Sequence, residues 1–225
     1  MLSISVSCII KEKIRGIKFG LLLAENVKVL QNDPRFEKEL TDLAEELKNK
    51  FTDHRPSEDD TVSHVRRMYR RIGWEPTQYR PSSEALVRRL LKNKGLYRIN
   101  NLVDYGNLVS ARYHISMGLY DTDKINGQPV FDVGHEGESY QGISKDSIRA
   151  EGKLILRDDT GIFGNPTADS MRTAITAQTK SALAIFFCPP EVEDMYLQKV
   201  LDALQYYYSQ SSPYAIIENR IYKPS

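Results

Sequence analysis

The sequence predicts one α+β domain, residues 1–225, in which helices flank a sheet-rich core. Three observations support this fold class. Apolar residues recur at helical spacing early in the chain, short apolar runs between glycine turns fill the middle, and the two kinds of segment do not alternate regularly. With 225 residues, 40% of them hydrophobic, the chain can bury a substantial core.

The first part of the chain is predicted to form two strands and a helix. Residues 2–10 alternate between apolar residues and serine, which is typical of a half-buried strand, and residues 17–24 form a more continuous apolar run. Asp33 and Pro34 are expected to start a helix, with Asp33 as its N-cap. Apolar residues then recur at helical spacing as far as Phe51, so one face of this helix should pack on the core.

Three more helices are expected before the strand-rich middle. They cover residues 62–72, a segment from Pro81 or Ser82 to a stop at Gly95, and residues 100–114, where helical spacing fits slightly better than strand spacing.

The remainder of the chain is predicted to be rich in strands. After Leu119, glycine turns separate short apolar runs, which is typical of strands joined by hairpins. A buried strand at 183–188, a helix at 191–208 and a strand at 214–222 are expected to complete the fold.

Charge is segregated along the chain, although the formal net charge is only +1. Residues 61–98 carry ten Lys or Arg and two acidic residues, whereas residues 25–60 carry eleven acidic and six basic residues. The near-neutral total gives no global reason to expect nucleic acid or a membrane as a partner. No apolar run approaches the roughly 18 residues of a membrane span. The N-terminus resembles a strand rather than a signal peptide, so a cytoplasmic protein is expected.

The basic segment is a candidate RNA-binding surface. Its arginines could contact phosphates, and Tyr69, Trp74 and Tyr79 lie between them and could stack on exposed bases. The alternative is a solvated helix face that pairs with the acidic helix at residues 37–46. The candidate RNA-binding residues are Arg66, Arg67, Arg70, Arg80, Arg88 and Arg89.

A dense polar cluster follows the basic segment. Asn100, Asn101, Asp104 and Asn107 recur at helical spacing, so their amides and carboxylate could converge on the ammonium and carbonyl groups of a ligand. The alternative is that they cap the helix and fasten loops. The functional hypothesis is that this segment forms the wall of a cleft.

No pattern in the sequence indicates a metal site, a cofactor or a catalytic nucleophile. The four histidines show no metal-ligand spacing with one another or with the two cysteines, and no serine lies in a nucleophile elbow. His114 is closest to the polar cluster, but a hydrogen-bonded structural histidine is the favoured interpretation. Asp121, Asp123 and the pair Asp158–Asp159 are expected to shape turns.

Four short segments resemble a known family. INNLVDYGN, GLYDTDKI, NGQP and the pair Gly137–Glu138 are similar to the editing domain of the phenylalanyl-tRNA synthetase beta subunit, over about residues 80–187. The chain looks like a free-standing relative, since it contains no recognisable aminoacylation core, ATP-binding motif or anticodon module. The resemblance implies a three-layer core with a β-sandwich flanked by helices. It also implies a pocket for an amino acid esterified to tRNA, which in the family hydrolyses tyrosine wrongly attached to the phenylalanine tRNA.

The residues of that pocket correspond only in part. Asn107 falls on a family asparagine beside the substrate, whereas Gly106 falls on a threonine and Gly118 on a histidine near the scissile ester. The family glutamate on a late strand has no counterpart, because residues 170–190 contain no acidic residue. The loop 161–173 resembles the family's Gly-rich loop. The predicted substrate-binding residues are Asn107, Asp104, Asn101, Gly118, Gly161 and Ser170.

The sequence therefore predicts a protein that binds aminoacyl-tRNA or a related aminoacyl ester and hydrolyses mischarged tRNA in trans. No residue stands out as a general base, so the ribose hydroxyl of the tRNA would assist, while Asn107 and backbone N–H groups polarise the carbonyl. The alternative is a module that binds tRNA or a small amino-acid-like ligand without catalysis. A protein-interaction domain is a third hypothesis, based on the aromatic run Tyr206–Tyr208.

Overall fold

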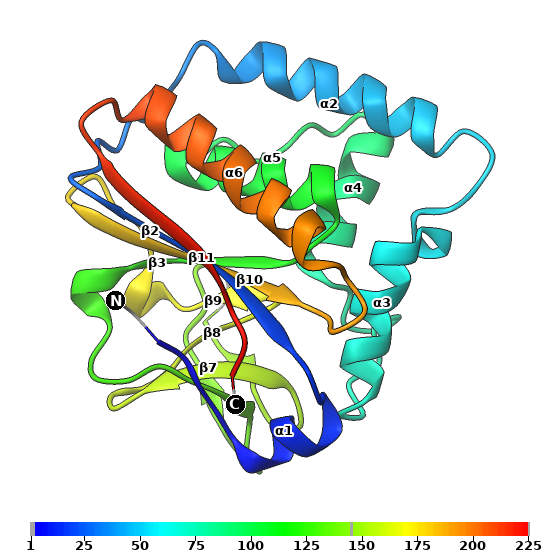
Figure 1. The fold of residues 1–225 in the computed structure, drawn as a ribbon, viewed down its shortest axis with the longest axis vertical. Coiled ribbons are helices and arrows are strands. Elements are labelled where there is room, and N and C mark those ends of the chain that lie inside the picture. The colour runs from blue at the N-terminus through cyan, green and yellow to red at the C-terminus, as the bar shows by residue number, and fades with distance from the viewer. Residues whose placement is uncertain (1–2, 145, 225) are drawn as a thin grey trace.

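The computed structural model describes residues 3–144 and 146–224. Within them the protein has three layers: helices, a four-stranded sheet beneath the helices, and a five-stranded sheet that packs on the other face of the first (Figure 1). The predicted α+β class and the sandwich flanked by helices are confirmed.

The four-stranded sheet is the middle layer and is antiparallel throughout. Its order is β11-β2-β10-β3. Side chains of β10 alternate between the two faces, so that Phe187 packs in the sandwich and Phe186 packs against the helices. Burial on both faces explains the continuous apolar run of this strand. The strands are β2 (Lys18–Glu25), β3 (Met117–Asp121), β10 (Ser181–Cys188) and β11 (Ile216–Tyr222).

The five-stranded sheet has the order β1-β4-β7-β8-β9. Only the short β1 pairs parallel to its neighbour; the other pairs are antiparallel, with a register shift at Leu156 and Arg157. A separate two-stranded ribbon, β5 and β6, lies between β4 and β7 in sequence. These strands are β1 (Ser5–Val6), β4 (Val130–Val133), β5 (Ser139–Tyr140), β6 (Ile148–Arg149), β7 (Leu154–Asp158), β8 (Gly161–Asn165) and β9 (Ala168–Asp169).

Aromatic side chains fill the space between the two sheets. Phe19 of the middle sheet lies 5.2 Å from Phe131 of the outer sheet, centroid to centroid, and Phe131 lies 5.5 Å from Phe187. Such edge-on and tilted ring pairs add to the free energy gained by burial of their apolar area. This second core holds the outer sheet, and with it the short hairpin β8–β9, in a fixed position.

Helices cover the open face of the middle sheet (Figure 1). Helix α6 packs along β2 and β11, α5 packs against α6, and α2 and α4 pack on α5. Helix α3 contributes Val65, Met68 and Tyr69 to the sandwich core instead. The helices are α1 (Cys8–Lys13), α2 (Phe36–Lys50), α3 (Asp60–Arg70), α4 (Ser82–Leu91), α5 (Asn101–Tyr113) and α6 (Asp194–Ser211), with single 3₁₀ turns η1 (Pro56–Glu58), η2 (Thr122–Lys124) and η3 (Met171–Thr173). No helix among the described residues is long and apolar enough to cross a membrane.

The predicted strand at residues 2–10 is wrong over most of its length. Leu2 lies outside the described residues; within residues 3–10 only Ser5–Val6 pair with β4, and the chain then forms helix α1. The serine alternation stops at Ser7, and Ile10 and Ile14, which are both buried, are four residues apart as on a helix. Cys8 is exposed on this helix.

The start of the second helix also differs from the prediction. Helix α2 begins at Phe36, and Arg35 rather than Asp33 is the N-cap. The Asp33 carboxylate instead accepts hydrogen bonds from Nε and Nη2 of Arg35 and from the Tyr105 hydroxyl. Arg35 holds the pKa of Asp33 below its ordinary value.

Candidate functional site

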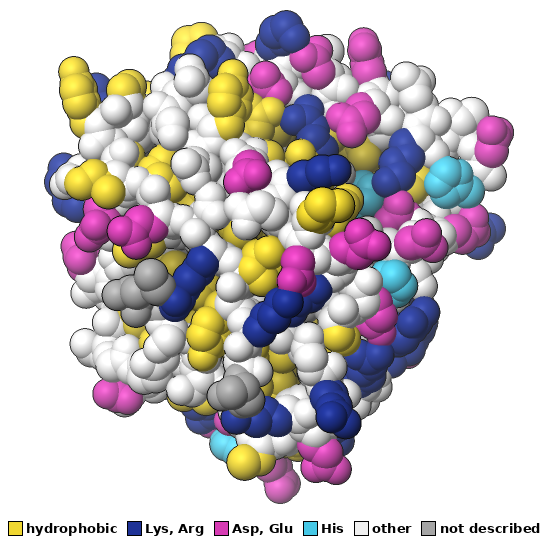
Figure 2. All heavy atoms as spheres, viewed as in Figure 1, with side chains coloured by type: hydrophobic (Ala, Val, Ile, Leu, Met, Phe, Trp, Pro, Cys, Tyr) yellow, Lys and Arg dark blue, Asp and Glu magenta, His cyan; other side chains and the backbone are white. Residues whose placement is uncertain are grey.

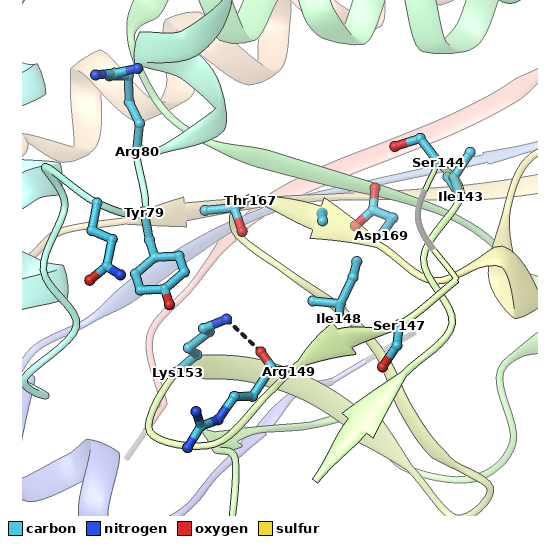
Figure 3. A pocket seen from close by; sticks show the side chains of 12 residues that line it. Tyr79, Arg80, Ile143, Ser144, Ser147, Ile148, Arg149, Lys153, Thr167 and Asp169 are labelled. Atoms are coloured by element: carbon cyan, nitrogen blue, oxygen red, sulfur yellow. Dashed lines mark hydrogen bonds between the residues drawn. The ribbon is translucent and has the colours of Figure 1, made fainter. Parts of the chain in front are cut away.

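A cavity of about 540 Å³ opens between the segment before α4, the β5–β6 ribbon and the β8–β9 hairpin (Figure 3). This volume lies within the range of small-molecule sites. Its wall combines hydroxyl, apolar, cationic and carboxyl side chains. The lining residues are Gln78, Tyr79, Arg80, Ile143, Ser144, Ser147, Ile148, Arg149, Lys153, Thr167, Ala168 and Asp169.

Asp169 is the only carboxylate among the described residues that line this wall. It stands at the end of β9, and its Oδ2 accepts a hydrogen bond of 3.2 Å from the Leu119 N–H of β3. The residue is partly exposed, but Oδ1 is buried and has no hydrogen-bond partner among the described residues. Burial raises the pKa of Asp169 to about 7, while the nearby Tyr120 hydroxyl and the Leu119 N–H partly offset this rise.

The Tyr120 hydroxyl lies beside this carboxyl. Its ring is fully buried, and its oxygen likewise has no partner in hydrogen-bond geometry within the described part of the chain. A Cβ atom added to Gly164 would lie 2.6 Å from the Tyr120 oxygen and 2.9 Å from Oδ1 of Asp169, and one added to Gly118 would lie 1.9 Å from the Tyr120 oxygen. The absence of a side chain at Gly118 and Gly164 therefore makes room for the Tyr120 hydroxyl and the Asp169 carboxyl.

Three cations surround the cavity mouth. Lys153 donates a hydrogen bond of 2.5 Å to the Arg149 carbonyl, and its Nζ lies 4.3 Å from the centre of the Tyr79 ring. Arg149 is paired with Glu151 at 2.8 Å, and the Nε atom of Arg80 lies 3.7 Å from Glu84. The wall thus carries more positive than negative charge and suits a ligand with anionic groups.

A second, shallower hollow of about 280 Å³ lies along the outside of α4. We call it the α4 hollow. Arg80 lines both the cavity and the α4 hollow. The guanidinium of Arg89 stacks on Tyr97 at 4.0 Å, and none of the lining residues is acidic. The lining residues are Arg80, Ala85, Leu86, Arg88, Arg89, Lys92, Lys94 and Tyr97.

Comparison with known proteins identifies the family. The B3/4 domain matches residues 64–193, more than half of the chain. This chain belongs to the B3/4 domain family. The matched segment contains every residue that lines the cavity and the α4 hollow, and it encloses the predicted family-like segment 80–187.

Individual relatives of this B3/4 domain are distant in sequence. A protein of Bacillus subtilis (strain 168) named "Uncharacterized protein YhzB" is 19% identical over 209 residues, which cover 93% of this chain and 94% of that protein. The phenylalanine–tRNA ligase beta subunit of Neisseria meningitidis serogroup B (strain ATCC BAA-335 / MC58) is 26% identical over 90 residues, which cover 40% of this chain and 11% of the subunit. An N-terminal fragment of the phenylalanyl-tRNA synthetase beta subunit from Pyrococcus horikoshii matches 96% of this chain at 12% identity, with a TM-score of 0.46.

The Neisseria match relates part of this B3/4 domain to the beta subunit of a phenylalanine–tRNA ligase. The chain spans half of the Pyrococcus fragment and 11% of the Neisseria subunit. The resemblance stated from the sequence motifs is confirmed at the level of this family.

The predicted polar cluster does not line the cavity of this B3/4 domain. Asn100 caps α5 by accepting the Val103 N–H at 3.0 Å. Asn101 is buried and ties the helix to the β2–α2 connection through the Leu30 N–H and the Lys28 carbonyl. The buried Asp104 accepts from the Ile99 N–H at 2.8 Å and from Nε of Arg98 at 3.0 Å.

The other predicted substrate residues are divided between the two regions. Asn107 is half-buried on α5 and is not among the lining residues. Gly118 lies beside the Tyr120 hydroxyl, next to the cavity floor. Gly161 starts β8 with φ +135°, and the Ser170 hydroxyl accepts the Arg172 N–H, so both shape the chain around the site. The structure does not bring Asn107 and Asp104 into one cavity with the 161–170 loop.

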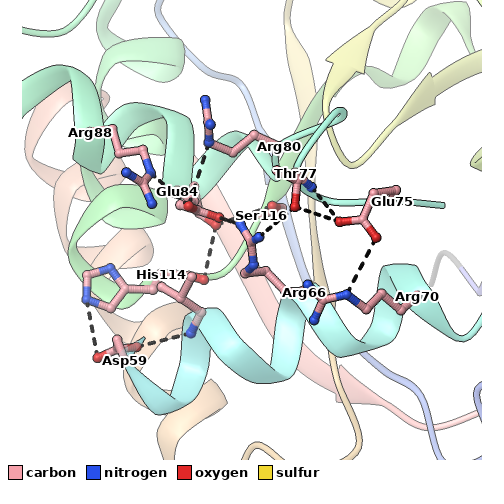
Figure 4. A network of polar contacts seen from close by, with 12 residues as sticks. Asp59, Arg66, Arg70, Glu75, Thr77, Arg80, Glu84, Arg88, His114 and Ser116 are labelled. Atoms are coloured by element: carbon pink, nitrogen blue, oxygen red, sulfur yellow. Dashed lines mark hydrogen bonds and ion pairs between the residues drawn. The ribbon is translucent and has the colours of Figure 1, made fainter. Parts of the chain in front are cut away.

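Five of the six predicted arginines, all except Arg89, lie within 4 Å of an acidic side chain. Glu84 is fully buried on α4 and faces Arg66 at 2.8 Å, Arg88 at 2.8 Å and Arg80 at 3.7 Å (Figure 4). This single carboxylate therefore fixes the arginine shared by the cavity and the α4 hollow. The alternative partner, the acidic helix α2, pairs with Arg98 and Arg112 instead.

Three predicted arginines lie on α3 and do not line the cavity; two of them, Arg67 and Arg70, pair with acids other than Glu84. Dark-blue side chains gather over α3 in Figure 2, and this helix carries Arg67 and Arg70. Arg67 lies 3.7 Å from Glu191 and Arg70 lies 3.7 Å from Glu75. Of the aromatic residues proposed to stack on bases, Tyr69 and Trp74 are buried and stack on each other at 4.3 Å. Tyr79 alone of the three remains exposed, at the cavity mouth.

His114 is structural, as the favoured interpretation held. It is buried, its Nε2 lies 2.9 Å from Nζ of Lys50, and it does not line the cavity. Burial, and then the Lys50 charge, lower the pKa of His114 to about 4. No group of three or more His, Cys, Asp or Glu side chains that could hold a metal ion occurs in the part of the chain that the structure describes.

The aromatic run near the C-terminus is mostly core. Tyr208 is fully buried and donates to the Leu102 carbonyl, and Tyr207 stacks on Tyr105 at 4.8 Å. Tyr206 is 60% exposed. A single exposed ring is ordinary for a protein surface, so this run gives little support to a protein-interaction domain.

Sequence reasoning missed Asp169, which lies one position before the predicted Ser170. The family resemblance placed an acidic residue after Ser170, on the late strand, and not before it. A single carboxylate in a loop of small and polar residues has no distinguishing sequence pattern. Its isolation becomes visible only when burial and hydrogen bonding are known.

Proposed function

We propose that this chain binds the aminoacyl end of a tRNA and hydrolyses the ester between the amino acid and the terminal ribose. In this proposal the cavity holds the amino acid and ribose, and the α4 hollow holds phosphates of the tRNA backbone. Membership of the B3/4 domain family supports the proposal, since this domain is related to the editing and tRNA-binding region of the synthetase beta subunit.

The observation that carries the proposal is the position of Arg80. Arg80 lines both the cavity and the α4 hollow, so the two adjoin at this residue, and in the proposal one extended ligand occupies both. A charged tRNA end combines a small acyl group with a run of phosphates. That combination matches a small cavity with a carboxyl group beside a hollow lined by cations and one aromatic ring.

Selection of the amino acid would differ from the family pattern. The family histidine is replaced by Gly118, and the space above this glycine is taken by the Tyr120 hydroxyl. The late-strand glutamate is absent, whereas Asp169 reaches the cavity from β9. Buried polar groups discriminate strongly between ligands that do and do not satisfy them. We therefore propose an amino acid other than tyrosine as the preferred acyl group.

Deacylation of a panel of tRNAs, each charged with one standard amino acid, tests the proposal. We expect the wild-type protein to accelerate release of at least one amino acid over the uncatalysed rate. Ser147→Trp places a large ring at the exposed cavity mouth and should reduce this rate about tenfold or more. Ser209→Trp makes the same change on the exposed surface of α6 and serves as the matched control.

Asn107→Ala separates this site from the one predicted on α5. If the wall of α5 binds the acyl group, this variant should lose activity while Ser147→Trp keeps it. If the cavity binds the acyl group, Ser147→Trp should lose activity and Asn107→Ala should keep it. No acceleration with any charged tRNA would rule out the catalytic part of the proposal.

A second candidate function is binding of charged tRNA without hydrolysis. The observation that favours it is Gly118, which supplies no imidazole at the position where the family carries one. A tRNA whose amino acid is joined by an amide cannot be hydrolysed readily and reports binding alone. Tight binding of this analogue without deacylation of any ester would select the second candidate.

A further inference from the structure

We propose that Asp169 is the catalytic base of the hydrolysis and that Tyr120 is the residue that positions it. This inference rests on the proposed function and names the group that performs its chemistry.

The geometry of Asp169 suits this role. One oxygen, Oδ2, is fixed by the backbone N–H of Leu119 at 3.2 Å, so the carboxyl group has a defined orientation at the cavity wall. The other oxygen, Oδ1, is buried near the Tyr120 hydroxyl but is not in hydrogen-bond geometry with any group among residues 3–144 and 146–224. A buried carboxylate oxygen outside hydrogen-bond geometry costs free energy, and a carboxyl of this kind in a cavity wall is a candidate for a chemical role.

Tyr120 lies where its hydroxyl can interact with Asp169 in either protonation state of the carboxyl group. A phenol can donate to a carboxylate and can also accept from a protonated carboxyl group. The phenol and this carboxyl are close neighbours, and Gly118 and Gly164 leave the space in which the two side chains meet. A side chain at either glycine would overlap the phenol, so this arrangement depends on both.

The groups around the carboxyl set its proton affinity. Tyr140 of β5 is close enough for Asp169 to raise the pKa of its phenol, although the Tyr140 hydroxyl itself donates to the Ala168 carbonyl at 2.6 Å. Tyr79 and the three cations of the mouth, Arg80, Arg149 and Lys153, face the same cavity. Burial is the largest influence and raises the pKa of Asp169 to about 7, against the opposing effects of the Tyr120 hydroxyl and the Leu119 N–H. A base with this proton affinity is half ionised near neutral pH, which is favourable for general base catalysis.

The reaction balances with water as the only co-reactant. The oxygen of a water molecule adds to the ester carbonyl carbon while one of its protons moves to the Asp169 carboxylate. The bond between that carbon and the ribose oxygen then breaks, and its electron pair leaves with the ribose oxygen, which takes the proton from Asp169. The products are the free amino acid and the tRNA with its terminal hydroxyl restored.

Asp169→Asn tests the base directly, because the amide oxygen can still accept from Leu119. With the charged tRNA that the wild-type protein cleaves fastest, we expect the single-turnover rate to fall about 100-fold or more. Affinity for the amide-linked analogue of the same tRNA should stay within about threefold. Asp123→Asn makes the same change at an exposed residue of η2 and should keep the wild-type rate.

The pH dependence separates a base from a merely structural carboxyl. The wild-type rate should rise with pH and level off above about 7, and Asp169→Asn should lose this inflection. The Tyr120 hydroxyl lowers the pKa of Asp169, so Tyr120→Phe should move the inflection to higher pH. Circular dichroism of each variant verifies that it is folded.

Each outcome decides the inference. A wild-type rate in Asp169→Asn overturns it and leaves the proposed function standing. Loss of analogue affinity in Asp169→Asn, in proportion to the loss of rate, also overturns it, because Asp169 would then bind the substrate ammonium. Analogue binding without any wild-type hydrolysis overturns it and leaves only the binding module, while failure of both binding and hydrolysis removes the proposed function as well.

Discussion

The first turns of α5 and the floor of the cavity are both built from buried polar side chains, but their hydrogen bonding differs. At the start of α5, the side chains of Asn100, Asn101 and Asp104 are each bound to backbone groups or to Arg98. Beside the cavity, Oδ1 of Asp169 and the Tyr120 hydroxyl are close to each other, but neither is in hydrogen-bond geometry with any group within the described residues.

This difference shows which polar clusters are informative about function. The density of polar residues pointed to α5, where side chains replace backbone partners at a helix start. Satisfied groups of this kind stabilise the fold and have no capacity left for a ligand. A carboxyl that is buried, incompletely bound and open to a cavity on one side retains that capacity.

The largest expected effect is on stability, at Asp104. Asp104→Ala removes a buried carboxylate and leaves Arg98 and the Ile99 N–H without it, so the free energy of unfolding should fall by about 3 kcal/mol. Urea denaturation measures this change, with Asp42→Ala as the control, because the exposed Asp42–Lys38 pair should contribute less than about 1 kcal/mol. Equal losses in the two variants would contradict a structural role for the α5 cluster.

Substitution of Asp169, in the cavity wall, should raise the free energy of unfolding instead of lowering it. The pKa of Asp169 in the folded protein, about 7, lies above its ordinary value of 3.8, so the wild-type protein loses stability as pH rises between these values. Asp169→Asn lacks this loss and should be more stable than the wild type by about 1–3 kcal/mol at pH 8.

Denaturation at several pH values checks this prediction. The two curves of stability against pH should converge near pH 4, below which the wild-type carboxyl is protonated in both the folded and the unfolded protein. A constant difference across this range would mean that the carboxyl does not titrate as its surroundings indicate.

A smaller effect is expected at the helix cap. Asn100→Ala removes the acceptor of the Val103 N–H and should cost about 1 kcal/mol of stability. Deacylation per folded molecule should be unchanged. Loss of activity at full stability would show that the first turn of α5 contributes to the site, and would contradict a purely structural role for this segment.

The smallest effect is expected in the α4 hollow. Arg89→Ala and Lys92→Ala should each weaken binding of tRNA modestly and reduce the slope of log affinity against log salt concentration by about 1. Lys48→Ala, on α2, is the control for loss of an exposed cation outside the hollow. An unchanged slope in both α4 variants would contradict the proposed contacts of Arg89 and Lys92 with tRNA phosphates.

Much of the fold could be predicted because local periodicity and burial agree. β2, β10, α5 and β11 lie close to their predicted bounds, since their apolar residues face a core at the spacing of the element. The segment at residues 2–10 failed because an alternation of only a few residues was overridden by the packing of Ile10 and Ile14.

The site could be predicted only as far as its neighbourhood. The sequence pointed to the basic segment, to Gly118 and to the 161–173 loop, and these do surround the cavity or its floor. It did not select Asp169 or Lys153, because a lone carboxylate and a lone lysine acquire special properties from burial, which is not a property of the residue itself.

The sequence by itself determined the α+β composition, the likeness to the synthetase editing region and the concentration of positive charge before α5. Those properties follow from residue order along one chain. The tertiary structure decided which polar groups find partners. Glu84 pairs with three arginines, and Asp169 accepts a hydrogen bond from β3, and most of these contacts join segments that are distant in the sequence. Desolvation and pairing depend on those contacts, and they distinguish a satisfied helix cap from a buried carboxyl whose pKa is raised.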